Sequence, residues 1–202
     1  MKHSERSDAT QTRLRSVARE LFGTRGYVET SVDELVAAAG VTKGAFYHHF
    51  PDKEAIFRCV FEDAVRVVAE KVRAGGASAT SALERGRAGC RAFLEAACDP
   101  AQQRILLEDA PKVLGWAAMR EIEWSHGLAL MEALFTEAIS EGSLPGRSPI
   151  ALAHLFFGAL CEAGIYIARA EDPKAAFAEM ARGMDDMLTG LLDRAAAGSE
   201  RR

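Results

Sequence analysis

The sequence lacks the motifs on which most enzymes and metalloproteins depend. It has no glycine-rich phosphate-binding loop and no Gly-x-Ser-x-Gly nucleophile elbow. Its four cysteines include no Cys-x-x-Cys pair and show no metal-ligand spacing. These absences predict a chain with no catalytic site, no metal and no cofactor. They favour buried thiols in a reducing cytoplasm, with a redox sensor as the open alternative.

A second Glu-x-x-His pair is also missing. Glu123 and His126 have the spacing found in di-iron carboxylate bundles, but such sites need a second pair and two further glutamates. No other Glu-x-x-His occurs in the chain. We therefore expect a polar pair near a pocket wall or at the surface, and not a metal site.

Only one hydrophobic run is long enough to cross a bilayer. It covers residues 148–168 and contains one formal charge, Glu162, together with His154. The charge and the imidazole inside the run argue against a membrane span, and a helix that is apolar all round is otherwise buried in a core or an interface. The first twelve residues are polar and charged, so no signal peptide is expected. These features predict a cytoplasmic protein without a membrane partner.

Positive and negative charges nearly balance along the chain. The net charge is −4, and residues 1–50 carry seven Lys and Arg against six Asp and Glu. This balance argues against a general binder of polyanions. Any nucleic-acid contact must therefore come from a few well-placed residues, and from two copies of the chain rather than one.

Composition and periodicity predict an all-α protein. The sequence is 49% hydrophobic, rich in alanine and poor in β-branched runs. It has no internal repeat, and its main composition break is the segment 75–81. A further break is expected at Pro111. We expect about nine helices, near residues 10–25, 31–39, 43–49, 52–73, 81–97, 101–109, 116–141, 149–169 and 173–196.

Two short helices near the N-terminus predict a helix-turn-helix. Ser31 and Glu34 form a capping box that opens the first helix, and Gly40 ends it. Thr42 caps the second helix, in which Phe46 and Phe50 face inward. A short turn containing glycine between two such helices is typical of the motif. Polar residues of the second helix that could reach phosphates or base edges are Lys43, Tyr47, His48 and His49.

The segment from Leu14 to Phe57 resembles the DNA-binding domain of the TetR family of bacterial regulators, without a gap. The closest parts are GVTKGAFYHHFPDKEAIF and the preceding LF-x-x-x-GY. The resemblance implies a three-helix N-terminal domain joined through a long fourth helix to a C-terminal helical bundle that dimerises. The implied segments are a flexible arm (1–9), a helix-turn-helix domain (10–56), an effector-binding and dimerisation domain (57–196) and a flexible tail (197–202).

The same resemblance implies roles for residues of the motif. Lys43, Gly44 and Ala45 would lie at base edges, and His48 could contact either a base or a phosphate. Ala45 replaces the Thr or Ser that is common in the family, which exchanges a hydroxyl for contact with a thymine methyl. The implied phosphate contacts are Thr42, Tyr47, His49 and Lys53.

Large aromatic and methionine side chains in the middle of the chain predict an effector pocket. In proteins that this chain resembles, helices 5 to 7 form such a pocket, and ligand sites are mostly apolar with a few polar groups. The same residue types also build ordinary cores, and the sequence does not name a ligand. Trp124 is expected nearer the cavity than Trp116. The candidate lining is Phe93, Trp116, Met119, Glu123, Trp124, His126 and Met131.

An apolar seam near the C-terminus predicts a dimer interface. Its residues repeat at intervals of three and four over two heptads, as in a coiled coil. A seam this short could also belong to an intramolecular core. Two neighbouring helices with surplus apolar surface favour a dimer, as does the family resemblance. The candidate interface is Phe156, Leu160, Phe177, Met180, Met184, Met187 and Leu191.

These features together predict a homodimeric repressor bound to a palindromic operator. Two-fold symmetry sets the half-sites about one helical turn apart, roughly 34–36 Å, or somewhat more. By family analogy, a small and mostly apolar effector would change the separation of the recognition helices through the fourth helix and release the DNA. Two alternatives stay open: a ligand-independent regulator whose C-terminal domain only dimerises, and an activator that contacts polymerase.

Overall fold

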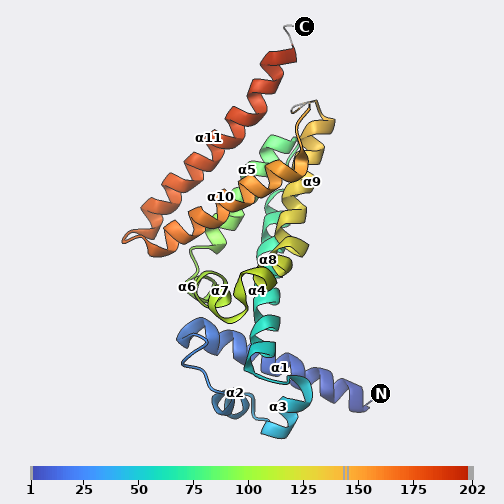
Figure 1. Ribbon diagram of the computed structural model, residues 1–202, viewed down its shortest axis with the longest axis vertical. Coiled ribbons are helices and arrows are strands. Elements are labelled where there is room, and N and C mark those ends of the chain that lie inside the picture. Colours follow the sequence, from blue (N-terminus) through green and yellow to red (C-terminus); the bar gives the residue numbers. More distant parts are fainter. Residues whose placement is uncertain (1, 143, 145, 200–202) are drawn as a thin grey trace. The chain divides into compact units, whose positions relative to one another are not determined.

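The computed structural model describes residues 2–142, 144 and 146–199, with side chains described for 7–142, 144 and 146–191 (Figure 1). These ranges contain helices and turns but no strand. Because α6, η1 and α7 are continuous, as are α8, η2 and α9, the described chain forms nine helical runs. The prediction of an all-α fold with about nine helices is confirmed. The elements are α1 (Lys2–Arg25), α2 (Val32–Ala39), α3 (Lys43–His49), α4 (Lys53–Gly75), α5 (Ala82–Ala96), α6 (Pro100–Gln103), η1 (Arg104–Asp109, a π-helix), α7 (Ala110–Val113), α8 (Gly115–Glu123), η2 (Trp124–Leu128, a π-helix), α9 (Ala129–Ser140), α10 (Pro149–Arg169) and α11 (Pro173–Ser199).

Both ends of the chain are more helical than expected. The first helix begins at Lys2 and not near Thr10, so residues 2–9 are helical and do not form an arm outside it. No proline or glycine precedes Gly23, so nothing in the sequence interrupts the helix. The last helix continues to Ser199, which makes residues 197–199 helical as well. The remainder of the predicted tail, 200–202, and Met1 lie outside the described residues.

The expected break at Pro111 is wrong. Residues 100–113 are continuously helical because η1 has π-helical hydrogen bonds, in which Ala110 N–H donates to the carbonyl of Ile105. The changed register accommodates a proline, which has no N–H to donate. The helical run ends instead before Gly115, whose φ of +71° is favourable only for glycine.

The chain divides into two compact units. Unit 1 comprises Met1–Ala64 and Pro100–Arg120, and unit 2 comprises Val65–Asp99 and Glu121–Arg202. The sequence-based boundary at residue 57 therefore falls inside unit 1. The reason is that Phe57 and Phe61 are fully buried, and the Phe57 ring packs edge-on against Phe22 of α1 at 5.3 Å.

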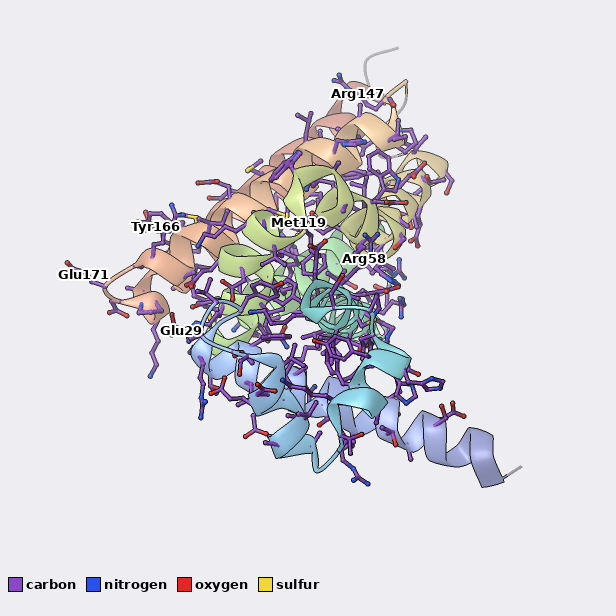
Figure 2. The ribbon with its side chains drawn as sticks, turned by 60° about the horizontal axis from the view of Figure 1, so that its bottom comes forward. Glu29, Arg58, Met119, Arg147, Tyr166 and Glu171 are labelled. Atoms are coloured by element: carbon purple, nitrogen blue, oxygen red, sulfur yellow. The ribbon has the colours of Figure 1, made fainter. Side chains whose placement is uncertain are left out.

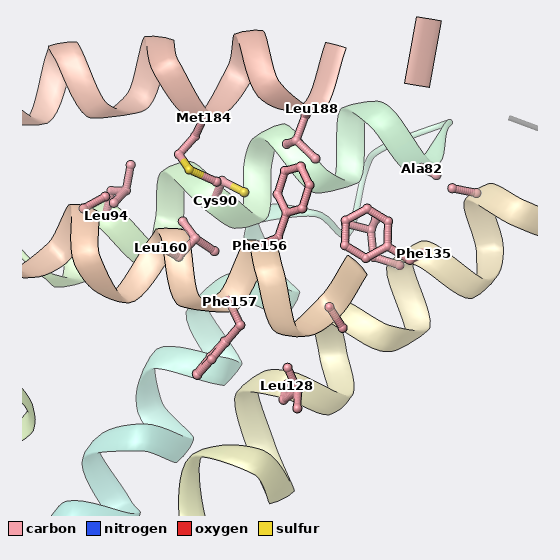
Figure 3. Close-up of a cluster of buried hydrophobic side chains, with 14 of the residues drawn as sticks. Ala82, Cys90, Leu94, Leu128, Phe135, Phe156, Phe157, Leu160, Met184 and Leu188 are labelled. Carbon is pink, nitrogen blue, oxygen red and sulfur yellow. The ribbon is translucent and has the colours of Figure 1, made fainter. Parts of the chain in front are cut away.

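The core of unit 2 lies where α5, α9, α10 and α11 meet (Figure 3). Phe135 and Phe156 pack with ring centroids 5.1 Å apart, and Leu188 lies beside them. The π-helix η2 brings Gly127 so close to Phe157 that a Cβ would lie 2.8 Å from the ring. A side chain at position 127 would therefore displace the ring or the helix.

The long apolar helix α10 is a core element of unit 2. It is long and hydrophobic enough to cross a membrane, with a mean hydropathy of 1.7 over its most apolar window. Its buried face nevertheless packs inside the protein, and this packing accounts for part of its apolar character. The buried residues are Ala153, Phe156, Phe157, Leu160, Ala163, Gly164 and Ile167.

Candidate nucleic-acid interface

Local hydrogen bonds fix the turn between α2 and α3. The hydroxyl of Ser31 accepts the Glu34 N–H at 3.2 Å, and the Glu34 carboxylate accepts the Ser31 N–H at 2.8 Å. Gly40 ends α2 in the left-handed conformation, with φ at +62°. The Thr42 hydroxyl then accepts the Ala45 N–H at 3.1 Å and opens α3. The predicted capping box, glycine stop and threonine cap are all confirmed.

The outer face of α3 is polar and exposed. Phe46 and Phe50 are buried beneath it, with at most 2% of their surface accessible. The Tyr47 side chain is 53% exposed, while one edge of its ring packs against Phe46 at 5.3 Å. The structure therefore leaves most of the predicted DNA-contacting residues at the surface of one short helix. Thr42, Lys43, Gly44, Tyr47 and His48 are exposed, and Ala45 and His49 are partly buried.

Lys43 is held by an acidic neighbour on α2. Its ammonium lies 2.6 Å from a carboxylate oxygen of Asp33, and both side chains are more than half exposed. The hydrogen bond to Asp33 raises the pKa of Lys43, so its charge is secure. To reach a base or a phosphate, Lys43 must exchange this carboxylate for the DNA.

We expect Asp33→Asn to tighten DNA binding by about fivefold on the operator and by less on random sequences. The change releases Lys43 and removes a negative charge near the phosphates, and the exposed ion pair that it breaks contributes little to stability. Fluorescence anisotropy with labelled duplexes at two salt concentrations measures the effect. The exposed Glu141→Gln in unit 2 makes the same charge change and should have no effect. Unchanged or weaker binding by Asp33→Asn would contradict the competition.

Lys53 is partly buried, and its ammonium points toward the loop between α1 and α2. Its ammonium donates to the carbonyls of Tyr27 at 2.9 Å and Thr30 at 3.0 Å, and lies 4.0 Å from the centroid of the Tyr27 ring. Burial lowers the pKa of Lys53 against the opposing attraction of Asp109. At least two of its three N–H donors therefore hold the loop between α1 and α2. The phosphate contact implied for Lys53 stays a proposal.

Two further residues hold the end of α1 and the loop that follows it, and neither was predicted from the sequence. The Asp109 carboxylate accepts the Tyr27 N–H at 2.8 Å, and Arg104 donates to the carbonyl of Thr24. Both lie on η1, about 80 positions later in the chain. Local patterns in the sequence carry no signal for contacts at this separation. The helix-turn-helix and η1 therefore belong to the same compact unit, unit 1.

Comparison with known proteins identifies the architecture. Residues 14–60 match the model described as "Bacterial regulatory proteins, tetR family", and residues 83–191 match "Tetracyclin repressor-like, C-terminal domain". The chain belongs to the TetR family of bacterial transcriptional regulators. Like other members of this non-enzymatic TetR family, it is a DNA-binding regulator of transcription.

Individual relatives agree over most of the chain. A TetR-family regulator from Pectobacterium atrosepticum is 38% identical, with 93% of this chain and 96% of that chain covered and a TM-score of 0.81. The TetC protein of transposon Tn10 from Escherichia coli is 26% identical over 89% of this chain and 92% of its own length. RolR, solved with its ligand resorcinol, has the same fold at 19% identity, with 95% and 96% of the two chains covered and a TM-score of 0.69.

The candidate effector residues fall in both units. Trp116 and Met119 belong to unit 1, where Trp116 is 67% exposed and lies 5.2 Å from the Arg120 guanidinium, while Met119 is buried (Figure 2). Trp124, in unit 2, is 45% exposed and packs against His154 at 4.5 Å. Phe93 and Met131 pack against the unit 2 core, and Glu123 and His126 are partly buried.

The dimer prediction needs a correction at three positions. Phe156, Leu160 and Met184 are 6%, 3% and 4% exposed within a single chain, so little of their surface is left for a partner to cover. They are buried because α11 packs its seam against α5 and α10. Phe177, Met180 and Leu191 are partly buried on the same side.

Other apolar side chains of these helices do face outward. Leu155 is 71% exposed, and Met187 of α11 is 48% exposed. Tyr166, labelled in Figure 2, lies on the same α10 face as Leu155, three turns later, and is 48% exposed. Of the predicted seam, Met187 is thus the residue that points away from the core. The spacing of an apolar seam does not show which side of the helix packs against the rest of the same chain. For this reason the predicted dimer interface did not include Leu155 and Tyr166.

Proposed function

We propose that the protein is a homodimeric repressor that binds a palindromic operator and is released from it by a small, mostly apolar effector. The observation that carries the proposal is the outer face of α3, where exposed Lys43, Tyr47 and His48 surround a threonine-capped helix start. A helix of this kind fits the major groove and presents donors to base edges. Such a regulator acts in the cytoplasm, where the chromosome lies.

Exposed apolar surface on α10 and α11 supports the dimer. Leu155, Tyr166 and Met187 are large side chains that a monomer gains nothing by exposing. A two-fold dimer that pairs α10 and α11 with their copies would cover these side chains and supply a second copy of α3. Two recognition helices compensate for the weakly basic character of each one.

The effector has support from the relatives and from the chain topology. RolR, which shares the fold, binds the small aromatic molecule resorcinol. Helix α4 begins in unit 1 and ends in unit 2, so ligand binding in one unit and DNA binding by the other share a helix. A ligand that weakens operator binding must itself bind more weakly to the DNA-bound dimer.

One observation favours the ligand-independent alternative. Both tryptophans, which the sequence places in an effector cavity, are close to half exposed or more in the structure. A screen of small molecules for loss of operator binding separates the two functions. Release by any compound at a saturating concentration supports the effector, and a screen without release supports a regulator that only dimerises.

We expect Lys43→Ala to relax the preference for one base pair in each half-site. Loss of a base contact costs about 1–3 kcal/mol at that position and leaves binding to random DNA much less affected. Selection of bound sequences from a random library, followed by anisotropy on the selected operator, measures both quantities. The exposed Lys71→Ala on α4 serves as the charge-matched control. Equal losses on specific and random DNA would remove Lys43 from base readout.

A further inference from the structure

A groove of about 470 Å³ lies between α5 and α11 in unit 2. Its floor is apolar and includes Cys90, Phe177 and Leu188. A volume of this size is within the range of small-molecule sites, about 300–1,000 Å³. None of the seven residues predicted for the effector pocket lines it, so the groove is a separate feature of the unit.

Arginines dominate the rim of the groove. Arg87, Arg91 and Arg182 line it together with a single acid, Asp185, and counting Glu95, which pairs with Arg91 beside the lining, the local charge is +1. This excess is unusual for the chain, because residues 51–202 carry a net charge of −5. The groove is therefore a positive site in an otherwise acidic part of the protein.

The three guanidinium groups differ in the ion pairs and hydrogen bonds that they already make. Arg87 is paired with Asp185 and also donates to the Thr189 hydroxyl at 2.8 Å. Arg91 is paired with Glu95 on its own helix at 3.0 Å, an exposed pair of low strength. For Arg182, no ion pair or hydrogen bond is found anywhere in the described part of the chain.

Arg91, on the rim of the groove, also contacts Phe177 on its floor. Its guanidinium lies 5.4 Å from the centroid of the Phe177 ring, within the range of a cation–π contact. The floor itself carries no charge, since burial raises the pKa of the Cys90 thiol to about 12 and keeps it protonated. An apolar floor thus lies directly beside two guanidinium groups that can take an anionic partner.

We propose that this groove binds a small amphipathic carboxylate. The apolar body of the ligand lies on Phe177, Cys90 and Leu188, and its carboxylate pairs with Arg182 and Arg91. Charge-assisted bonds from a guanidinium to a carboxylate are short and directional, which favours this head group over a hydroxyl of the same shape. The groove shares no residue with α3 or with the candidate effector residues, so this site goes beyond the proposed function.

Calorimetric titration of the full-length protein with octanoate and with octanol tests the proposal. We expect saturable octanoate binding and at least tenfold weaker octanol binding. Arg182→Gln should weaken octanoate binding about tenfold or more, and Arg91→Gln combined with Arg182→Gln should abolish it. Arg169→Gln, an exposed arginine of unit 2 outside the groove lining, should bind like the parent protein.

A second variant tests the floor without changing any charge. Ala178→Phe places a bulky ring in the groove and should block octanoate, while a thermal melt checks that the unit stays folded. Absence of octanoate binding by the parent protein, equal binding of octanoate and octanol, or unchanged binding by Arg182→Gln would overturn the proposal. Operator binding is measured separately, so its failure and that of this site remain distinguishable.

Discussion

Replacing Met184 with lysine is expected to unfold unit 2, whereas the same replacement at Met187 should leave the unit folded and split the dimer. Met184 is 4% exposed, between α5 and α10, and Met187 is 48% exposed one helical turn later. Lysine keeps an aliphatic stem, so the cost at Met184 comes from the unpaired buried ammonium and is on the order of several kcal/mol. This cost is comparable to the whole stability of a domain, about 5–15 kcal/mol.

Three measurements separate the two outcomes. Circular dichroism reports folding, sedimentation reports the dimer, and anisotropy with a palindromic duplex reports DNA binding. For Met187→Lys we expect native helicity, a monomer and loss of operator affinity, because the two recognition helices are no longer linked. Met187→Leu keeps the apolar surface and should stay dimeric. A folded Met184→Lys dimer would show that the burial of Met184 contributes little, and a dimeric Met187→Lys would place the interface elsewhere.

The helix-turn-helix could be predicted in detail because its determinants are local. The capping box joins Ser31 to Glu34, three residues apart, and Thr42 caps α3 through Ala45 at the same distance. Gly40 ends α2 because of its own backbone conformation. Each of these features depends on residue type and short spacing, both of which a sequence displays directly.

Features that depend on distant residues could not be predicted. Asp109 meets Tyr27 across 82 positions, and nothing in either segment indicates the other. The burial of Met184 and the exposure of Met187 depend on how α11 is rotated against α5 and α10, which the spacing of the seam leaves open. A helical pattern shows that a face is apolar, but not whether the same chain or a second copy covers it.

Lys53 has two competing roles, and Lys53→Met distinguishes them. If the ammonium mainly holds the loop, its loss leaves the carbonyls of Tyr27 and Thr30 without their charged donor. Hydrogen bonds to charged groups contribute about 1.5–3 kcal/mol each, and partial rehydration of the carbonyls reduces the loss. We therefore expect unit 1 to lose about 1–3 kcal/mol of stability, while methionine preserves most of the packing of the side chain.

A phosphate contact predicts a different result for the same variant. Loss of one such contact lowers affinity for all sequences and reduces the slope of log affinity against log salt by about 0.9, with no change in stability. Lys43→Met is the matched control, because Lys43 is 58% exposed and its removal should leave the melting temperature unchanged. Thermal melts, hydrogen exchange at the Tyr27 amide and salt-dependent anisotropy on both variants provide the comparison. Faster exchange and a lower melting temperature for Lys53→Met alone assign the residue to the loop. A reduced salt slope at unchanged stability assigns it to the DNA, and would mean that the ammonium leaves the Tyr27 and Thr30 carbonyls when the operator binds.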